Sequence, residues 1–256
     1  MFARPLRLWI VAGVAVAAIV VTVFLPRIPQ DPHYHAFADT RTVAGVPNFW
    51  NVVSNLGFVI VGLGGLVWIA RAGRGLARSL SDRWERVAAT VFAAGVALIG
   101  AGSAWYHWAP DNERLVWDRL PMTLVFMSLA ALVIGDRVGS AVGRRLFAPM
   151  LAIGPASVVV WHVTERIGRG DLRLYALVQF LPLLVIPLLL VLVPGRYTGA
   201  GFLWATLGLN ALGKVTELLD RETLAVFGIS GHTLKHVLMA VATALVLRML
   251  AVRRPR

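Results

Sequence analysis

Long apolar runs constrain this chain more than any other feature of its sequence. Eight of them follow one another, and each has roughly 18 residues or more, enough for a helix to cross the ~30 Å hydrocarbon layer of a bilayer. They cover residues 8–25, 49–70, 87–108, 116–134, 146–163, 174–193, 201–219 and 232–251. The runs therefore predict an all-α, polytopic membrane helix bundle.

The composition agrees with this prediction and argues against a separate soluble domain. Apolar residues make up 58% of the 256 residues and charged residues only 15%, values that do not describe a water-soluble globular protein. The connections between the runs are short and rich in Gly, Pro and Arg, so we expect residues 1–256 to form one integral membrane domain. Cysteine is absent, which excludes disulfides and thiolate metal ligands.

The first run, 8–25, shares features with a signal peptide, because Arg4 and Arg7 precede its apolar core. No small-x-small cleavage site follows it, and its core is long for a signal sequence. We therefore expect an uncleaved helix that precedes a seven-helix core.

Charged residues divide unevenly between the two sides of the predicted bundle. The arginine-rich stretch "RAGRGLARSLSDRWER" at 71–86 lies on the same side as both termini. By the positive-inside rule, this predicts that both termini are cytoplasmic. Such an orientation favours a bacterial inner membrane. This asymmetry accounts for the net charge of +12 without a nucleic-acid partner. All six histidines, and every acidic residue except Asp82, Glu85 and Asp136, fall on or near the opposite, extracytoplasmic side.

Three motifs place polar side chains at the outer ends of three different runs. "GHTLKH" puts His232 and His236 one turn apart on one helical face where the last run begins. "AGSAWYHW" puts Ser103 and His107 on one face at the end of the third run, and "LVWDRLPMT" puts Asp118 just inside the start of the fourth. We expect these five side chains to meet at one depth of the membrane.

Three neutral imidazoles are a ligand set for catalytic zinc, which keeps its fourth coordination place open for water. The ion lowers the pKa of that water to ~7, and a nearby carboxylate, here Asp118, can take the proton and return it to a leaving group. Ser103 could hydrogen-bond the water or a developing oxyanion. The sequence thus predicts a zinc site at His107, His232 and His236, with Ser103 and Asp118 as catalytic partners.

Other interpretations of these residues stay open. A single histidine in a membrane helix more often packs or hydrogen-bonds than binds metal, and serine there often serves helix packing. A receptor-like or lipid-binding protein could keep the metal as a structural site, which would be closed by four protein ligands. A proton-coupled transporter would place polar residues through the whole membrane, whereas the cytoplasmic halves of these runs are nearly uniformly apolar.

The segments "PNFWNVVSN", "GSAWYH" followed by "VWDRLPM", and "GHTLKH" resemble, in their order and spacing, the signatures of the alkaline ceramidase family. That family belongs to a superfamily of seven-helix membrane hydrolases that includes the progestin and adiponectin receptors. The resemblance covers residues 47–251. It implies an integral-membrane zinc amidohydrolase that cleaves the N-acyl bond of a sphingoid lipid such as ceramide, with His107, His232 and His236 as zinc ligands and Ser103 and Asp118 assisting.

One departure from the family pattern concerns calcium. Family members that bind this ion carry an acidic cluster before the first core helix, with a Glu ahead of the "FWN"-like motif, and here Asn48 occupies that position. Only Asp31 and Asp39 lie nearby, so a calcium site is doubtful.

The remaining polar residues on the extracytoplasmic side carry less specific expectations. Hydrogen bonds that join helices are expected of Asn51, Ser54 and Asn55. We expect Lys214, Glu217 and Asp220 to form an internal ion-pair ladder. We expect His33 and His35 to lie in a loop and to be solvated. The pocket wall and the headgroup boundary remain alternative positions for His162 and Glu165.

Overall fold

The computed structural model describes residues 3–72 and 79–256, and this part of the chain is helical with no β-strand. Its helices are α1 (Arg4–Phe24), α2 (Phe49–Val53), α3 (Leu56–Arg71), α5 (Arg83–Trp108), α6 (Asn112–Arg137), α7 (Ser140–Arg166), α8 (Arg173–Leu192), α9 (Ala200–Leu218), α10 (Asp220–Phe227) and α11 (Gly231–Val252), with a 3-10 turn, η1 (Pro32–His35). The all-α prediction is confirmed. Arg74 and Arg78 of the arginine-rich stretch lie outside the described residues.

Seven helical segments of the described chain are long and apolar enough to cross a membrane: Arg4–Phe24, Phe49–Arg71, Arg83–Trp108, Asn112–Arg137, Ser140–Arg166, Arg173–Leu192 and Gly231–Val252. The chain is therefore a multi-pass membrane protein. The run at 201–219 forms α9, a 19-residue helix that runs beside α11, but it does not reach the apolarity of these seven segments. Asn210, Lys214 and Glu217 lower its hydropathy because they are polar or charged, and all three line an internal cavity.

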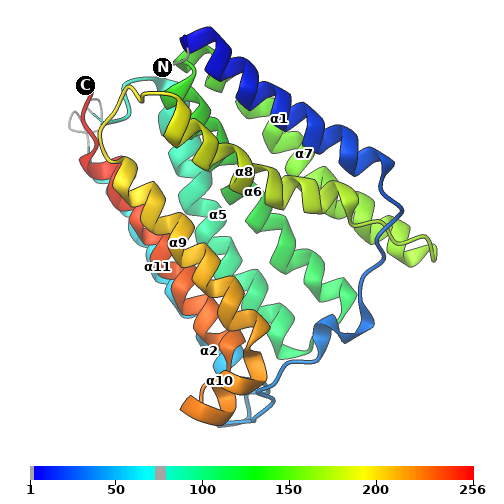
Figure 1. The fold of residues 1–256 in the computed structure, drawn as a ribbon. Helices are drawn as coiled ribbons and strands as arrows, with labels where there is room; N and C mark the ends of the chain where they lie inside the picture. The colour runs from blue at the N-terminus through cyan, green and yellow to red at the C-terminus, as the bar shows by residue number, and fades with distance from the viewer. Residues whose placement is uncertain (1–2, 73–78) are drawn as a thin grey trace.

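The long helices lie side by side in one bundle (Figure 1). α9 runs beside α11, and α5 packs between α3 and α6. α1 lies against α8 on one outer face, where Val11 is its buried contact residue and Arg7 Nη1 donates to the Leu192 carbonyl at 3.1 Å. α1 is thus an additional helix on the outside of a core that the other helices form.

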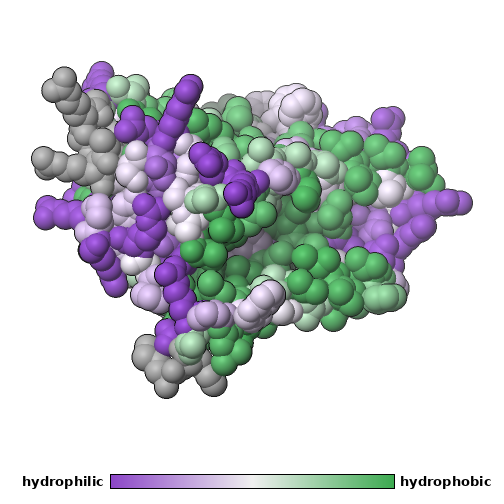
Figure 2. All heavy atoms as spheres, turned by 90° about the horizontal axis from the view of Figure 1, so that it is seen from above, coloured by the Kyte–Doolittle hydropathy of each residue, from purple (hydrophilic) through white to green (hydrophobic). Residues whose placement is uncertain are grey.

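Two ends of the bundle differ in chemistry. We call the end where α1 begins and α6, α8 and α11 finish the arginine end, and the opposite end, where α5 finishes and α6 and α11 begin, the histidine end. In Figure 2, hydrophobic residues cover the middle of one face and hydrophilic residues gather toward its two sides. This distribution matches a bundle whose middle faces lipid and whose ends face water.

The arginine end contains a buried polar network that the sequence did not predict. Glu85 is completely buried, with Arg253 Nη2 3.4 Å from Oε1 and the Tyr197 hydroxyl donating to Oε2 at 3.3 Å. The Tyr197 amide donates to Asp136 Oδ1 at 2.9 Å, and Asp136 pairs with Arg137. The halves of the helices at the arginine end are therefore less uniformly apolar than expected, since paired charges join the end of α11 to α5 and α6.

Candidate metal centre

A serine cap and a close contact with α9 fix the start of α11, just ahead of its two histidines. Ser230 caps the helix, because its hydroxyl accepts the Thr233 amide at 3.1 Å. Gly231 presses against α9 so closely that a Cβ there would overlap the Thr216 carbonyl. The glycine that opens "GHTLKH" therefore lets α11 approach α9, and this approach sets the depth of His232 and His236.

The structure brings His107 of α5 together with His232 and His236 of α11. All three are buried, and one ring nitrogen from each lies within 4.8 Å of the others. His107 Nε2 and His232 Nε2 are 3.3 Å apart. Two ligands on one tetrahedral zinc, each ~2.05 Å from the ion, would be separated by ~3.3 Å. The observed spacing fits a shared metal ion.

The hydrogen bonding of His236 leaves its Nε2 atom available to bind a metal ion. The Ser54 hydroxyl donates to the Asn51 carbonyl at 3.2 Å, so its oxygen is left to accept from His236 Nδ1 at 2.8 Å. A proton on Nδ1 leaves Nε2 with a free lone pair, the arrangement that supporting hydrogen bonds give to metal-binding imidazoles. The residues present thus fit a metal ion. The expected hydrogen bonds between helices are confirmed for Ser54 and for Asn51, whose Oδ1 accepts from the Thr233 hydroxyl of α11 at 2.8 Å, whereas Asn55 donates locally to the Asn51 carbonyl.

Charged residues of α9 and α11 surround His232. Glu217 Oε1 lies 3.9 Å from His232 Nδ1, and both Lys214 and Lys235 place their Nζ 2.6 Å from the Glu217 carboxylate. The Lys214–Glu217 pair was expected, whereas Asp220 accepts the His232 backbone amide at 2.8 Å instead of joining a ladder. Lys235 was not singled out from the sequence, although it stands between the two histidines of "GHTLKH".

Ser103 and Asp118 reach the same cavity as the three histidines. Ser103 is buried on α5 one turn before His107, and it is a hydrogen-bond partner of the Asp118 carboxyl on α6. The five predicted site residues therefore lie together. Their roles as ligands and catalytic groups stay predictions.

A cavity of about 510 Å³ runs from the histidines into the bundle. Its far part is lined by apolar side chains from five helices, among them Phe92, Leu129, Ile186, Leu203 and Val246. His232 and Val246, both on its wall, are ~21 Å apart along α11 at 1.5 Å per residue, more than half of a ~30 Å hydrocarbon layer. A single lipid chain can lie in this space with its polar group at the histidines.

A loop between α1 and α2 covers the histidines from the outside. The Phe37 ring packs on His107 and His232, with ring centroids 4.6 and 4.5 Å away. His35, expected to be solvated, is instead held between the Tyr106 hydroxyl at 2.8 Å and Asn112 Oδ1 at 3.0 Å. The prediction for His35 was wrong because the loop packs onto α5 and α6, whereas His33 is exposed as expected.

The acidic residues considered for calcium are engaged elsewhere. Asp39 pairs with Arg41, and Asp31 accepts the His33 amide at 2.8 Å. Asn48, at the position of the family's Glu, donates from Nδ2 to the His107 carbonyl at 2.8 Å. Asn48 thus supports the end of the helix that carries a predicted zinc ligand.

His162 and Glu165 do not line the cavity. His162 Nε2 lies 3.3 Å from Glu113, and the Glu165 carboxylate accepts the Gln30 amide at 3.1 Å. Of the two alternatives left by the sequence, the structure excludes the pocket wall for both residues.

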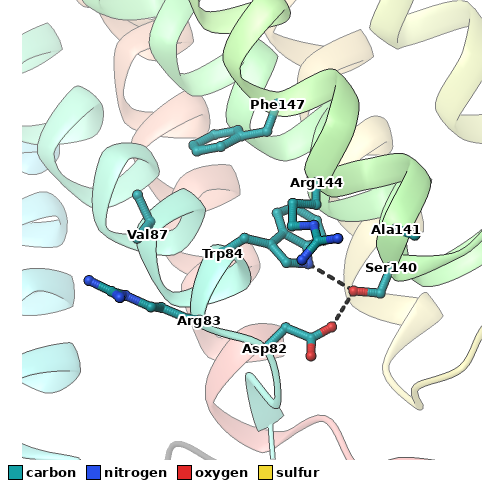
Figure 3. Close-up of a pocket in the computed structure, with 8 residues that line it drawn as sticks. All are labelled: Asp82, Arg83, Trp84, Val87, Ser140, Ala141, Arg144 and Phe147. Atoms are coloured by element: carbon teal, nitrogen blue, oxygen red, sulfur yellow. Dashed lines mark hydrogen bonds between the residues drawn. The ribbon is translucent and has the colours of Figure 1, made fainter.

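A second cavity, of about 560 Å³, lies at the arginine end between α5 and α7 (Figure 3). Trp84 Nε1 donates to Ser140 Oγ at 2.8 Å, and Ser140 Oγ donates to the Asp82 carboxylate. Asp82 also forms a capping box with Glu85 at the start of α5. These polar groups satisfy one another and join two helices, which is a structural role.

No protein-family model matches this chain, and a search of curated proteins gave no match.

Proposed function

We propose that this protein is a zinc-dependent membrane hydrolase that cleaves the amide bond of an N-acyl lipid. The observation that carries the proposal is the position of three buried histidines at the polar end of a long, otherwise apolar cavity. The resemblance to alkaline ceramidases makes a ceramide-like lipid the first substrate to test. The arginine-rich stretch supports cytoplasmic termini, which would put the histidine end on the extracytoplasmic side.

His107, His232 and His236 would hold the zinc ion. Zinc with three protein ligands supplies a Lewis acid and a water activated at neutral pH. In the described chain these three histidines are the group able to bind a metal, and three protein ligands in place of four would favour catalysis over a structural site.

Amide hydrolysis adds one water: its oxygen joins the carbonyl carbon, the C–N bond breaks, and the nitrogen gains a proton. Asp118 would accept the proton from the water and deliver it to the leaving nitrogen, which separates as an amine from a fatty acid. Ser103, hydrogen-bonded to Asp118, would keep that carboxyl directed at the reacting group. The apolar part of the cavity would hold the acyl chain.

The test combines elemental analysis of the detergent-purified protein with incubation in a fluorescent N-acyl sphingosine. We expect one zinc per chain and fatty-acid release, with both lost in His107→Ala and His236→Ala. His162→Ala is the matched control, since that histidine lies outside the cavity. Asp118→Asn should keep its zinc while hydrolysis falls by about 10²–10⁴-fold, the usual contribution of an acid–base group.

The outcomes separate the candidate functions. A protein without zinc would contradict the central claim. Zinc without hydrolysis of any N-acyl lipid would favour a receptor-like or lipid-binding protein with a structural metal.

A further inference from the structure

Arg119 is a buried cation on the wall of the same cavity, and the proposed reaction does not use it. It lies on α6 directly after Asp118, and only 4% of its surface is exposed. Its guanidinium group is surrounded by the rings of Trp161, Tyr175 and Tyr34, at 4.3, 4.7 and 5.2 Å from the ring centroids. Three elements far apart in sequence thus hold this cation in place.

The hydrogen bonds of Arg119 are incomplete. Nη2 donates to Gln30 Oε1 at 2.8 Å, but Nε and Nη1 have no partner among the described residues. The indole Nε1 of Trp161, beneath the guanidinium, also has none. An arginine side chain keeps its charge at any physiological pH and can only donate. The cluster therefore has unused donors around a positive charge that forms no ion pair within the described chain.

Burying a charged group is costly unless it is paired and hydrogen-bonded. The aromatic rings attract the cation but cannot accept its in-plane N–H groups as an oxygen does. Lys214 and Lys235, the other cations on the cavity wall, are each paired with Glu217. Asp118, the other acidic residue on this wall, is hydrogen-bonded to Ser103. Arg119 is thus the cation on this wall, within the described chain, whose N–H groups are left for a ligand.

We propose that Arg119, held in place by Gln30 and Tyr34, forms a subsite for an anionic headgroup, a phosphate or carboxylate carried by the lipid in the cavity. This inference rests on the proposed hydrolase for the identity of the scissile bond. It makes the substrate an N-acyl lipid with a negative charge beyond the amide. A neutral ceramide would leave the Arg119 donors without an acceptor.

Binding tests the subsite without relying on catalysis. The full-length, zinc-loaded protein is titrated with dodecyl phosphate, with dodecanol and with orthophosphate. We expect dodecyl phosphate to bind about 10–100-fold more tightly than dodecanol, the usual effect of hydrogen bonds to a charged group. Orthophosphate that binds as tightly as dodecyl phosphate would overturn the assignment to a lipid headgroup.

Variants of Arg119 test whether its guanidinium group binds the phosphate. Arg119→Gln should lose the preference for dodecyl phosphate, and Arg119→Lys should keep part of it because the charge remains. Arg114→Gln is the control, since Arg114 lies on the same helix and also packs on a tryptophan, but does not line the cavity. Zinc content confirms that each variant is folded. A preference unchanged in Arg119→Gln would show that the zinc or a lysine binds the phosphate, which overturns the proposal.

Hydrolysis distinguishes this inference from the proposed function. N-dodecanoyl-O-phosphoethanolamine and N-dodecanoylethanolamine differ only in the phosphate, and we expect kcat/KM to favour the former by about 10-fold or more in wild type and not in Arg119→Gln. Equal hydrolysis of both lipids would leave the hydrolase standing and contradict the subsite. Binding that depends on Arg119 without hydrolysis of either lipid would support the subsite and contradict the hydrolase.

Discussion

Ser54 illustrates how a single residue outside a metal-ligand set can decide whether a ligand is ready to bind. Its hydroxyl gives its own proton to Asn51 and accepts the Nδ1 proton of His236. Removing that acceptor would free the imidazole to rotate and to change tautomer. At this scale the site depends on a contact between residues 182 positions apart in the sequence.

We therefore expect Ser54→Ala to weaken zinc binding by about 10–100-fold, the usual effect of losing a supporting hydrogen bond. Competition with a chelator would measure the affinity. Ser128→Ala is the control, because Ser128 is also buried but donates only within α6, to the Leu124 carbonyl. An equal loss of zinc affinity in both variants would point to general destabilisation of the protein.

Asp39 makes the stability of the covering loop depend on pH. The hydrogen bond from Arg41 holds the pKa of the Asp39 carboxyl below its ordinary value. The pair therefore stabilises the fold above the unfolded-state pKa of ~3.9, and its contribution is lost as the pH falls through the lower, folded-state pKa. Because Arg41 is half exposed, the contribution is small.

We expect Asp39→Asn to lower the apparent Tm at pH 7, and its difference from wild type to shrink as the pH falls below about 4, because the unfolded chain then binds a proton at Asp39 more readily than the folded protein does. Thermal unfolding in detergent between pH 3 and 7 would measure this. A difference in Tm that stays constant from pH 3 to pH 7 would show that the charge of Asp39 does not contribute to stability.

Among the elements, α3 approaches α5 through a glycine. A Cβ at Gly62 would overlap the backbone of Ala97, whereas a Cβ at Gly64, two positions farther along the same helix, would have nothing within 4 Å. Helices that meet through small residues are characteristic of membrane bundles. The contact holds α3 against the helix that carries His107.

Gly62→Ala should destabilise the protein by about 1–3 kcal/mol through overpacking, which lowers the apparent Tm by roughly 2–10 °C for a chain of this size. Gly64→Ala should be neutral or slightly stabilising, because alanine favours helix by ~1 kcal/mol over glycine. Thermal unfolding of the two variants in the same detergent checks the contrast. A similar Tm for both would mean that α3 does not lie this close to α5.

The helices themselves could be predicted, because apolar runs of membrane length leave few alternatives. α9 also forms as expected, but its sequence does not tell that Asn210 and Lys214 face a cavity. The site was predictable where its residues share a short motif, as His232 and His236 do. Lys235, and the surroundings of Arg119, depend on contacts between distant elements that no local pattern records.

For the whole molecule, the opposite character of the two ends predicts its orientation. The chain has no cysteine, so any cysteine introduced would be the one thiol present. Arg145 is exposed at the arginine end, and Glu222 is exposed on α10 at the histidine end. These two positions can therefore report which end faces which side.

We expect a membrane-impermeant maleimide to label Glu222→Cys in intact cells and Arg145→Cys only after permeabilisation, as cytoplasmic termini require. Detergent-solubilised samples of both variants control for reactivity. The reverse pattern would place the histidine end in the cytoplasm.

Phe37 covers the histidines on the outside, while on the other side the cavity wall reaches Phe180, a half-exposed residue on the surface of α8. A lipid would then reach the metal from within its leaflet, without first dissolving in water. For the proposed hydrolase, turnover would follow the mole fraction of substrate in the membrane. Adding inert phospholipid at a fixed amount of substrate would slow the reaction by surface dilution, although the bulk concentration stays the same.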